Sequence, residues 1–158
     1  SHYGRVAILD LDYHHGNGTQ EFFAERRHVF TSSIHGDPDF EYPYFWGYAD
    51  EKGRGQGLGT NLNLPLPKGT RAPAYLKAVD CFCKVVCAFK PDFLIIAAGF
   101  DTHKTDPIGG FVLQTRDYRK IGTGLAALEV PTLICQEGGY NTTVLGDCVH
   151  SFLSGFKD

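Results

Sequence analysis

The sequence contains no methionine, not even at its first position, and it has a single tryptophan among 158 residues. No apolar run approaches the roughly 20 residues that a helix needs to span a bilayer, and the N-terminus lacks a signal-peptide pattern. The 15 Lys and Arg residues form no basic run, and a formal net charge of -3 gives no electrostatic reason to expect nucleic acid as a partner. We therefore expect a cytoplasmic protein that binds neither membranes nor nucleic acid.

Cysteine is present, but its number and spacing argue against a structural role. Five cysteines cannot all pair within one chain, and no two of them form a CxxC pair of the kind that structural zinc sites use. Cys81, Cys83 and Cys87 share one apolar segment, whereas Cys135 and Cys148 lie far along the chain. We interpret them as reduced, mostly buried thiols of an intracellular protein.

Short apolar runs alternate with segments of helical spacing along the chain. Three runs are nearly continuous in Val, Ile, Leu and Ala, which is typical of parallel strands covered on both faces. The expected strands are 5–12, 92–101 and 131–139, with 28–35 as a fourth and 61–66 as a weaker candidate; the expected helices are 19–26, 72–89, 116–128 and 142–156. This alternation predicts an α/β fold with a largely parallel sheet flanked by helices on both faces.

One long stretch breaks this alternation. Residues 35–59 hold six aromatic residues among Gly, Pro and charged residues, and the stretch ends in a glycine-rich run. A loop of this length inside a compact domain is uncommon and is more often functional than not.

Acidic residues and histidines gather where three of the expected strands end. The segments are DLDYHHGNGT (10–19), GFDTHKTDP (99–107) and EGGY (137–140). In open parallel sheets, ligands bind outside the carboxyl ends of the strands. We therefore expect the three segments to converge on one rim of the sheet.

Within these segments, three residues have the chemistry of a metal site. Asp12 and His14 point the same way because residues two apart in a strand share a face, and Asp101 supplies a third ligand from another strand end. Three ligands with an open position suit a catalytic metal, and mixed O and N ligands fit Zn²⁺, with Fe²⁺, Co²⁺ and Mn²⁺ as alternatives. The competing interpretation, that Asp10 and Asp12 cap the following helix, explains only one of the three segments.

The same segments resemble a known superfamily. DLDYHHGNGTQ, AAGFDTHKTDP and QEGGYN resemble the zinc-ligand, third-ligand and catalytic-tyrosine segments of the histone deacetylase and acetylpolyamine amidohydrolase superfamily. The stretch IHGDPDFEYPYFWGYADEKGRGQG resembles most closely the acetylpolyamine amidohydrolase branch. The resemblance covers essentially the whole chain in the family's order. It implies an arginase/deacetylase-like fold and a zinc-dependent deacetylase that hydrolyses acetylpolyamine or acetyl-lysine amides with metal-activated water.

Carried over position by position, the resemblance also implies individual roles. Asp12, His14 and Asp101 would bind zinc, and Tyr140 would donate a hydrogen bond to the substrate carbonyl and the oxyanion. A buried potassium ion and a substrate tunnel are implied as well. The potassium ligands would be Asp10, Ser33 and the backbone carbonyls of Asp12, His14 and Ile34, and the tunnel residues would include Tyr42, Gly138 and Gly139.

The chain departs from the family in what it lacks. Family members carry a His-His dyad upstream of the first zinc segment as general base and acid, and this chain has no second adjacent pair. We therefore expect residues 1–158 to be a single partial deacetylase domain, with the N-terminal half as its missing partner. Such a chain is expected to be catalytically weak or inactive, and its exposed strand edges favour self-association into a homo-oligomer.

Several functions stay open at this point. An acidic gatekeeper after the third ligand would favour polyamines, but Ile108 stands there, so the choice between acetylpolyamine and acetyl-lysine is undecided. The long aromatic loop favours the small-molecule branch. A non-catalytic module that keeps the metal and binds partners is a third possibility. A binuclear arginase-like hydrolase is a weaker one, since it should show more paired Asp and His ligands.

Overall fold

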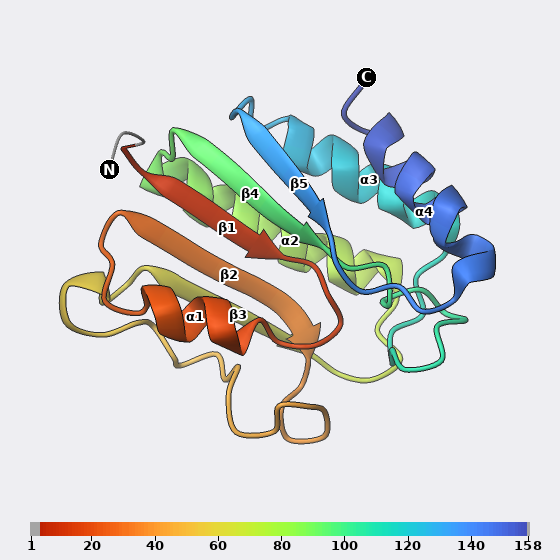
Figure 1. Cartoon of the computed structure of the whole chain (residues 1–158), viewed down its shortest axis with the longest axis horizontal. Coiled ribbons are helices and arrows are strands. Elements are labelled where there is room, and N and C mark those ends of the chain that lie inside the picture. Colours follow the sequence, from red (N-terminus) through yellow and green to blue (C-terminus); the bar gives the residue numbers. More distant parts are fainter. Residues whose placement is uncertain (1–3, 158) are drawn as a thin grey trace.

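Five parallel strands form the centre of the molecule (Figure 1). The computed structural model describes residues 4–157, so the ends of the expected domain, residues 1–3 and 158, lie outside the described residues. The strand order is β3-β2-β1-β4-β5, and all four neighbouring pairs are parallel. The strands are β1 (Val6–Asp10), β2 (Val29–Gly36), β3 (Asn61–Leu66), β4 (Phe93–Ala98) and β5 (Thr132–Gln136). The expected α/β fold is confirmed, including the weaker candidate strand.

The helices begin and end where the sequence carries the matching signals. Pro73 lies in the first turn of the longest helix, and Lys90 ends it with a left-handed φ of 54°. Asn141 caps the last helix by accepting a hydrogen bond from the backbone N–H of Thr143 at 3.2 Å. The helices are α1 (Asn17–Phe23), α2 (Ala72–Phe89), α3 (Thr115–Ala126) and α4 (Thr142–Ser154), with a short 3₁₀ turn η1 (Gly55–Gly57). None of the helices in residues 4–157 has the length and apolar character to cross a membrane.

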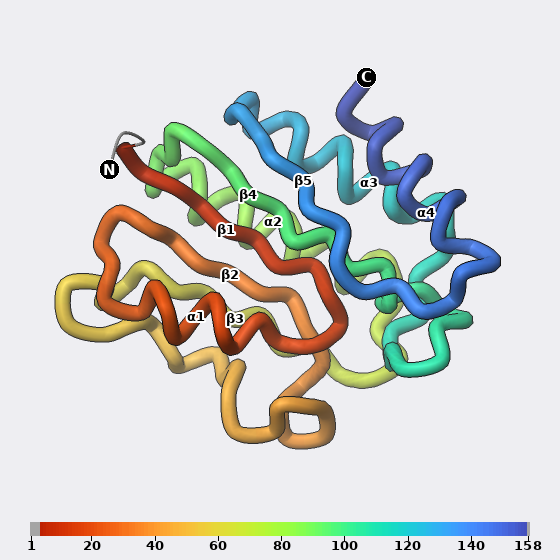
Figure 2. The backbone as a smooth tube through the Cα atoms, in the orientation of Figure 1, coloured from red at the N-terminus to blue at the C-terminus, as the bar shows by residue number. Residues whose placement is uncertain are grey.

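The aromatic stretch is shorter than the sequence indicated. β2 continues to Gly36, because His35 and Gly36 pair in register with Pro65 and Leu66 of β3. His35 is therefore a buried strand residue, and the irregular loop begins at Asp37. Figure 2 shows the loop extending beyond β2 and β3 before the chain returns to the sheet.

The two faces of the sheet are covered unequally. Figure 1 shows α2 and α3 behind the sheet, α4 beside α3, and α1 in front of β2 and β3. The main core lies on the α2 and α3 side, where alternate strand residues such as Leu9, Leu94 and Ile96 are fully buried. Helices do lie on both faces, as expected, but only α1 lies on the front face within residues 4–157.

The front face of β1, β4 and β5 is apolar and partly exposed. The parallel register places Ile8, Ile95 and Leu133 in one row across these three strands. Ile8 and Ile95 are half-buried, and Leu133, on the edge strand, is 48% exposed. Parallel sheets are normally covered on both faces, so this row favours contact with a further layer of structure.

Replacing Leu133 with Glu is therefore expected to weaken self-association of the chain by about tenfold, because a carboxylate in this row disfavours apolar contact between copies. Sedimentation velocity over a concentration series measures the change. Leu153→Glu is the matched control, since Leu153 is 40% exposed but lies on α4, away from the row. Equal loss of association in both variants would show that the sheet face is not the contact.

Candidate metal centre

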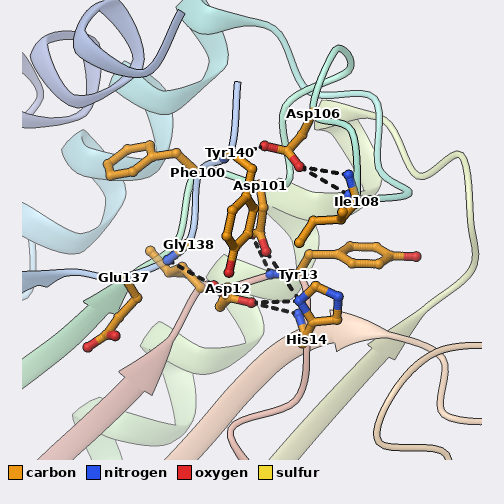
Figure 3. Close-up of polar contacts among 12 residues, drawn as sticks. Asp12, Tyr13, His14, Phe100, Asp101, Asp106, Ile108, Glu137, Gly138 and Tyr140 are labelled. Atoms are coloured by element: carbon orange, nitrogen blue, oxygen red, sulfur yellow. Dashed lines mark hydrogen bonds and ion pairs between the residues drawn. The ribbon is translucent and has the colours of Figure 1, made fainter. Parts of the chain in front are cut away.

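Asp12, His14 and Asp101 meet beyond the carboxyl ends of β1 and β4 (Figure 3). One candidate ligand atom from each residue lies within 4.8 Å of the other two. Nδ1 of His14 lies 3.1 Å from Oδ1 of Asp12 and 3.3 Å from Oδ2 of Asp101. Asp101 is completely buried, whereas the other two are half-buried and open to one side. The fold thus brings together the three residues that the sequence predicted as ligands.

Backbone hydrogen bonds to the carboxylates hold the segment after β1 in place. The N–H of Tyr13 donates to Oδ1 of Asp101 at 2.8 Å, across 88 positions of sequence. The N–H of His14 donates to Oδ1 of Asp12 at 2.9 Å, and the N–H of Gly138 donates to Oδ2 of Asp12 at 3.1 Å. A Cβ on Gly138 would lie 2.2 Å from that same oxygen, so only glycine fits behind the ligands.

The close approach of two carboxylates and one imidazole shifts the pKa values of the triad residues. Burial and the nearby charge of Asp12 raise the pKa of the Asp101 carboxyl above its ordinary value. Close contact with the carboxylates of Asp101 and Asp12 raises the pKa of His14 to about 10. In the metal-free protein, a proton on the His14 ring therefore stands between the two carboxylates, where a cation would otherwise be.

One oxygen of the triad is left without a hydrogen bond. Oδ2 of Asp101 is buried and accepts no hydrogen bond, and its contact with the His14 ring at 3.3 Å is an ion pair only. A buried carboxylate oxygen costs free energy unless it is paired or coordinated. Two carboxylates and one imidazole, with a buried oxygen that accepts no hydrogen bond, fit a divalent cation, and three protein ligands leave a position for a substrate.

Tyr140 lies beside this triad. Its ring extends from the chain after β5 toward Asp12 and Asp101, and 53% of the residue is exposed (Figure 3). Partial burial and the charges of the two carboxylates raise the pKa of its phenol, so the hydroxyl stays protonated and can donate at neutral pH. Gly139, with φ of 135°, makes the turn that precedes it.

The sequence did not reveal the role of Asp106, although the Asp-Pro dipeptide is a signal for a turn. One carboxylate oxygen of Asp106 accepts the N–H groups of Tyr140 at 2.8 Å and Asn141 at 3.2 Å. The other accepts those of Ile108 at 3.0 Å and Gly109 at 3.2 Å (Figure 3). Asp106 therefore fixes the tyrosine segment relative to the loop that follows β4.

The residues expected to bind potassium lie on neighbouring strands. Asp10 and Ser33 are register partners of the β1–β2 pair. Burial raises the pKa of Asp10 to about 8, and the charged neighbours that act on it are the carboxylates of Asp12, Asp101 and Glu137. A monovalent cation would favour the ionised form of Asp10, so this carboxylate fits such an ion. The carbonyls of Asp12, His14 and Ile34 stay a prediction as its other ligands.

The expected tunnel residues occupy different positions. The Tyr42 ring, 58% exposed, lies edge-on to the His14 ring at a centroid distance of 6.3 Å, so it borders the site. Gly138 lies against the ligands, because a Cβ there would be 2.2 Å from Oδ2 of Asp12 and 2.9 Å from Oδ2 of Asp101. The assignment of Tyr42, Gly138 and Gly139 to a substrate tunnel stays a prediction.

The Histone deacetylase domain family matches residues 1–156. The chain belongs to the histone deacetylase family. Within this family it is 48% identical over 153 residues to Acetylpolyamine amidohydrolase 1 of Pseudomonas aeruginosa, an alignment that covers 97% of this chain and 44% of that protein. It is 38% identical over 160 residues to Histone deacetylase 8 of Arabidopsis thaliana, covering 96% of this chain and 42% of that protein.

A solved structure extends the comparison to three dimensions. The crystal structure of an acetylpolyamine aminohydrolase from Burkholderia pseudomallei matches with a TM-score of 0.95 and 44% identity, covering 98% of this chain and 45% of that one. The deacetylase-like fold expected from the sequence is thereby confirmed. The chain spans less than half the length of these histone deacetylase family relatives.

Asp106→Asn is expected to lower the free energy of unfolding by about 1–2 kcal/mol, because the new amide group faces backbone donors that the carboxylate accepted. Urea denaturation followed by circular dichroism measures the change. Asp50→Asn is the control, since Asp50 is an exposed acid of the aromatic loop. Unfolding curves of Asp106→Asn that coincide with those of the control would contradict this role.

The affinity of the triad for a divalent metal is expected to rise with pH. Because the pKa of His14 in the metal-free protein is about 10, the ring is protonated near neutrality and must release this proton to become a ligand. The apparent affinity should then increase about tenfold per pH unit. Competition for Zn²⁺ with a chelator between about pH 6 and 8, corrected for the chelator's own protonation, measures the slope; a flat profile would contradict a protonated His14.

Proposed function

We propose that this chain is the metal-bearing part of a zinc-dependent deacetylase that hydrolyses the amide bond of acetylated amines. The observation that carries the proposal is the triad of Asp12, His14 and Asp101, with a buried oxygen on Asp101 that accepts no hydrogen bond. The deacetylase and amidohydrolase names of the relatives support the reaction class.

The triad and Tyr140 would have separate roles in the reaction. Asp12, His14 and Asp101 would hold zinc, which when bound polarises the acetamide carbonyl and activates water. Tyr140 keeps its proton at neutral pH and donates it in a hydrogen bond to the carbonyl oxygen as negative charge develops there. A donor of this kind contributes about 3–4 kcal/mol to stabilisation of the transition state.

The aromatic loop favours an acetylpolyamine as substrate. Residues 37–51 contain five carboxylates and six aromatic rings and no Lys or Arg. Several of these rings are exposed, Phe40 at 75% and Phe45 at 81%. Carboxylates and aromatic faces both attract ammonium groups, so the loop suits an organic cation. An acetyl-lysine side chain in a protein is the second candidate substrate.

The general base is the function that this chain does not supply by itself. Its one adjacent histidine pair is His14-His15, and His14 belongs to the triad. Both ring nitrogens of His15 are buried without a hydrogen-bond partner, and burial lowers the pKa of the ring to about 3. His15 therefore cannot reach a substrate or accept its proton near neutrality. We propose that the remaining half of the domain provides this group and covers the row of Ile8, Ile95 and Leu133.

Metal content of the purified chain tests the proposal directly. About one zinc per chain is expected, and Asp101→Asn should lose it, because one of three ligands is removed. Tyr140→Phe is the matched variant, since it should keep the metal and lower any measurable hydrolysis of an N-acetylated diamine by about 10²–10³-fold. A folded wild-type chain without metal would overturn the ligand assignment.

The same preparations distinguish the candidate functions. Hydrolysis of an acetylated diamine in preference to an acetyl-lysine peptide supports the polyamine substrate, and the reverse preference supports the lysine substrate. Efficient turnover by the 158-residue chain alone would contradict the proposal that it needs the other half of the domain. Metal binding with no turnover, even with that half added, would indicate a non-catalytic module.

A further inference from the structure

Gly47 is a buried point of attachment between the aromatic loop, residues 37–51, and the rest of the protein. Residues 44–50 are exposed except for Gly47, which is buried. Its immediate neighbour Trp46 is 50% exposed, and Phe45 before it is 81% exposed. A buried glycine within an exposed aromatic segment indicates a point of attachment rather than a free turn.

Side chains hold both backbone polar groups of Gly47. Its N–H donates to the two carboxylate oxygens of Glu51 at 3.2 and 3.0 Å. Its carbonyl lies 2.9 Å from Nε2 of His35, and because a carbonyl can only accept, Nε2 carries the hydrogen. Nδ1 of His35 then accepts from the Ser33 hydroxyl at 2.8 Å, which fixes the ring in this tautomer.

The space at Gly47 admits no side chain. Its φ is 108°, and a Cβ would lie 2.5 Å from Nε2 of His35 and 3.0 Å from Cγ of His15. The His15 and His35 rings lie 4.4 Å apart between their centroids. Since His15 directly follows His14, the loop packs against the segment that carries the metal ligands.

Glu51 connects this glycine to two other elements. Its Oε2 accepts from Nε2 of Gln20, on α1, at 2.6 Å and from Nδ2 of Asn63, on β3, at 3.1 Å. Oε1 of Gln20 in turn accepts from Asn63 at 2.8 Å. All three groups that donate to the Glu51 carboxylate are uncharged amides, and such charge-assisted bonds are stronger than neutral ones. An amide in place of the carboxylate would turn an NH₂ group toward some of these donors.

We propose that Glu51 is a positioning residue for the substrate side of the metal centre. Through Gly47 it sets where the aromatic segment 40–48 lies, and with it Tyr42, whose ring is 6.3 Å from that of His14. The consequence for substrate rests on the proposed function, whereas the placement of the loop does not depend on it.

Trp46 reports on the placement directly, because it is the single tryptophan of the chain and directly precedes Gly47. Glu51→Gln is expected to raise acrylamide quenching of Trp46 up to roughly twofold and to speed amide hydrogen exchange of residues 44–51 by about tenfold. Zinc content should stay at the wild-type value. Asp50→Asn, which removes the neighbouring exposed acid, should leave quenching and exchange unchanged.

A second substitution covers the case in which Glu51→Gln fails to fold. Glu51→Asp keeps the charge but shortens the side chain by one methylene, so it should release Gly47 and give the same two changes more weakly. Wild-type quenching and exchange in the folded variants would overturn the proposal.

Steady-state kinetics distinguish a role of Glu51 in positioning the loop from a role in the chemical step. In a preparation that hydrolyses an acetylated diamine, Glu51→Gln should raise KM about tenfold and change kcat less than about twofold, as expected when binding contacts are lost. A fall in kcat with KM unchanged would overturn the role on the substrate side. The two proposals can fail separately. If Glu51→Gln raises quenching and hydrogen exchange but the wild-type chain binds no zinc, the role of Glu51 in placing the loop holds and the proposed function is refuted.

Discussion

Buried negative charge at the carboxyl ends of the parallel strands is the constraint on which the rest of this structure depends. Asp10, Asp12 and Asp101 follow β1 and β4, and burial raises the pKa of Asp10 and Asp101. The ring of His14 forms ion pairs with two of them, Asp12 and Asp101. Because buried carboxylates need a counter-charge, the rim fits metal ions, and the glycines around it fit the close approach of backbone to the ligands.

Carboxylates also organise the loops around that rim. Asp106 accepts four backbone N–H groups and so joins the loop after β4 to the Tyr140 segment. Glu51 does the same for the aromatic loop through Gly47, with amides from α1 and β3 as further donors. In both cases an ionised side chain near the surface replaces the regular hydrogen bonds that a loop lacks.

The front face of β1, β4 and β5 bears on how much of the domain this chain contains. Ile8, Ile95 and Leu133 form an apolar row on a parallel sheet, which is normally covered on both faces. The chain spans less than half the length of these relatives, which agrees with our proposal that the remaining half of the domain covers this face and provides the general base.

The sequence by itself determined the element types and the parallel sheet, and it singled out Asp12, His14 and Asp101 as candidate ligands. The spacing of apolar residues and the position of acidic residues at strand ends are local properties of the chain. Only the tertiary structure decided what His35, Glu51 and Asp106 do. His35 lies where the expected strand 28–35 meets the irregular stretch, and the pairing of β2 with β3 places it in the strand. Glu51 contacts Gln20 and Asn63, which are 31 and 12 positions away, and Asp106 contacts Tyr140 at 34 positions. Contacts at such separations depend on how the chain folds back, which no local pattern records.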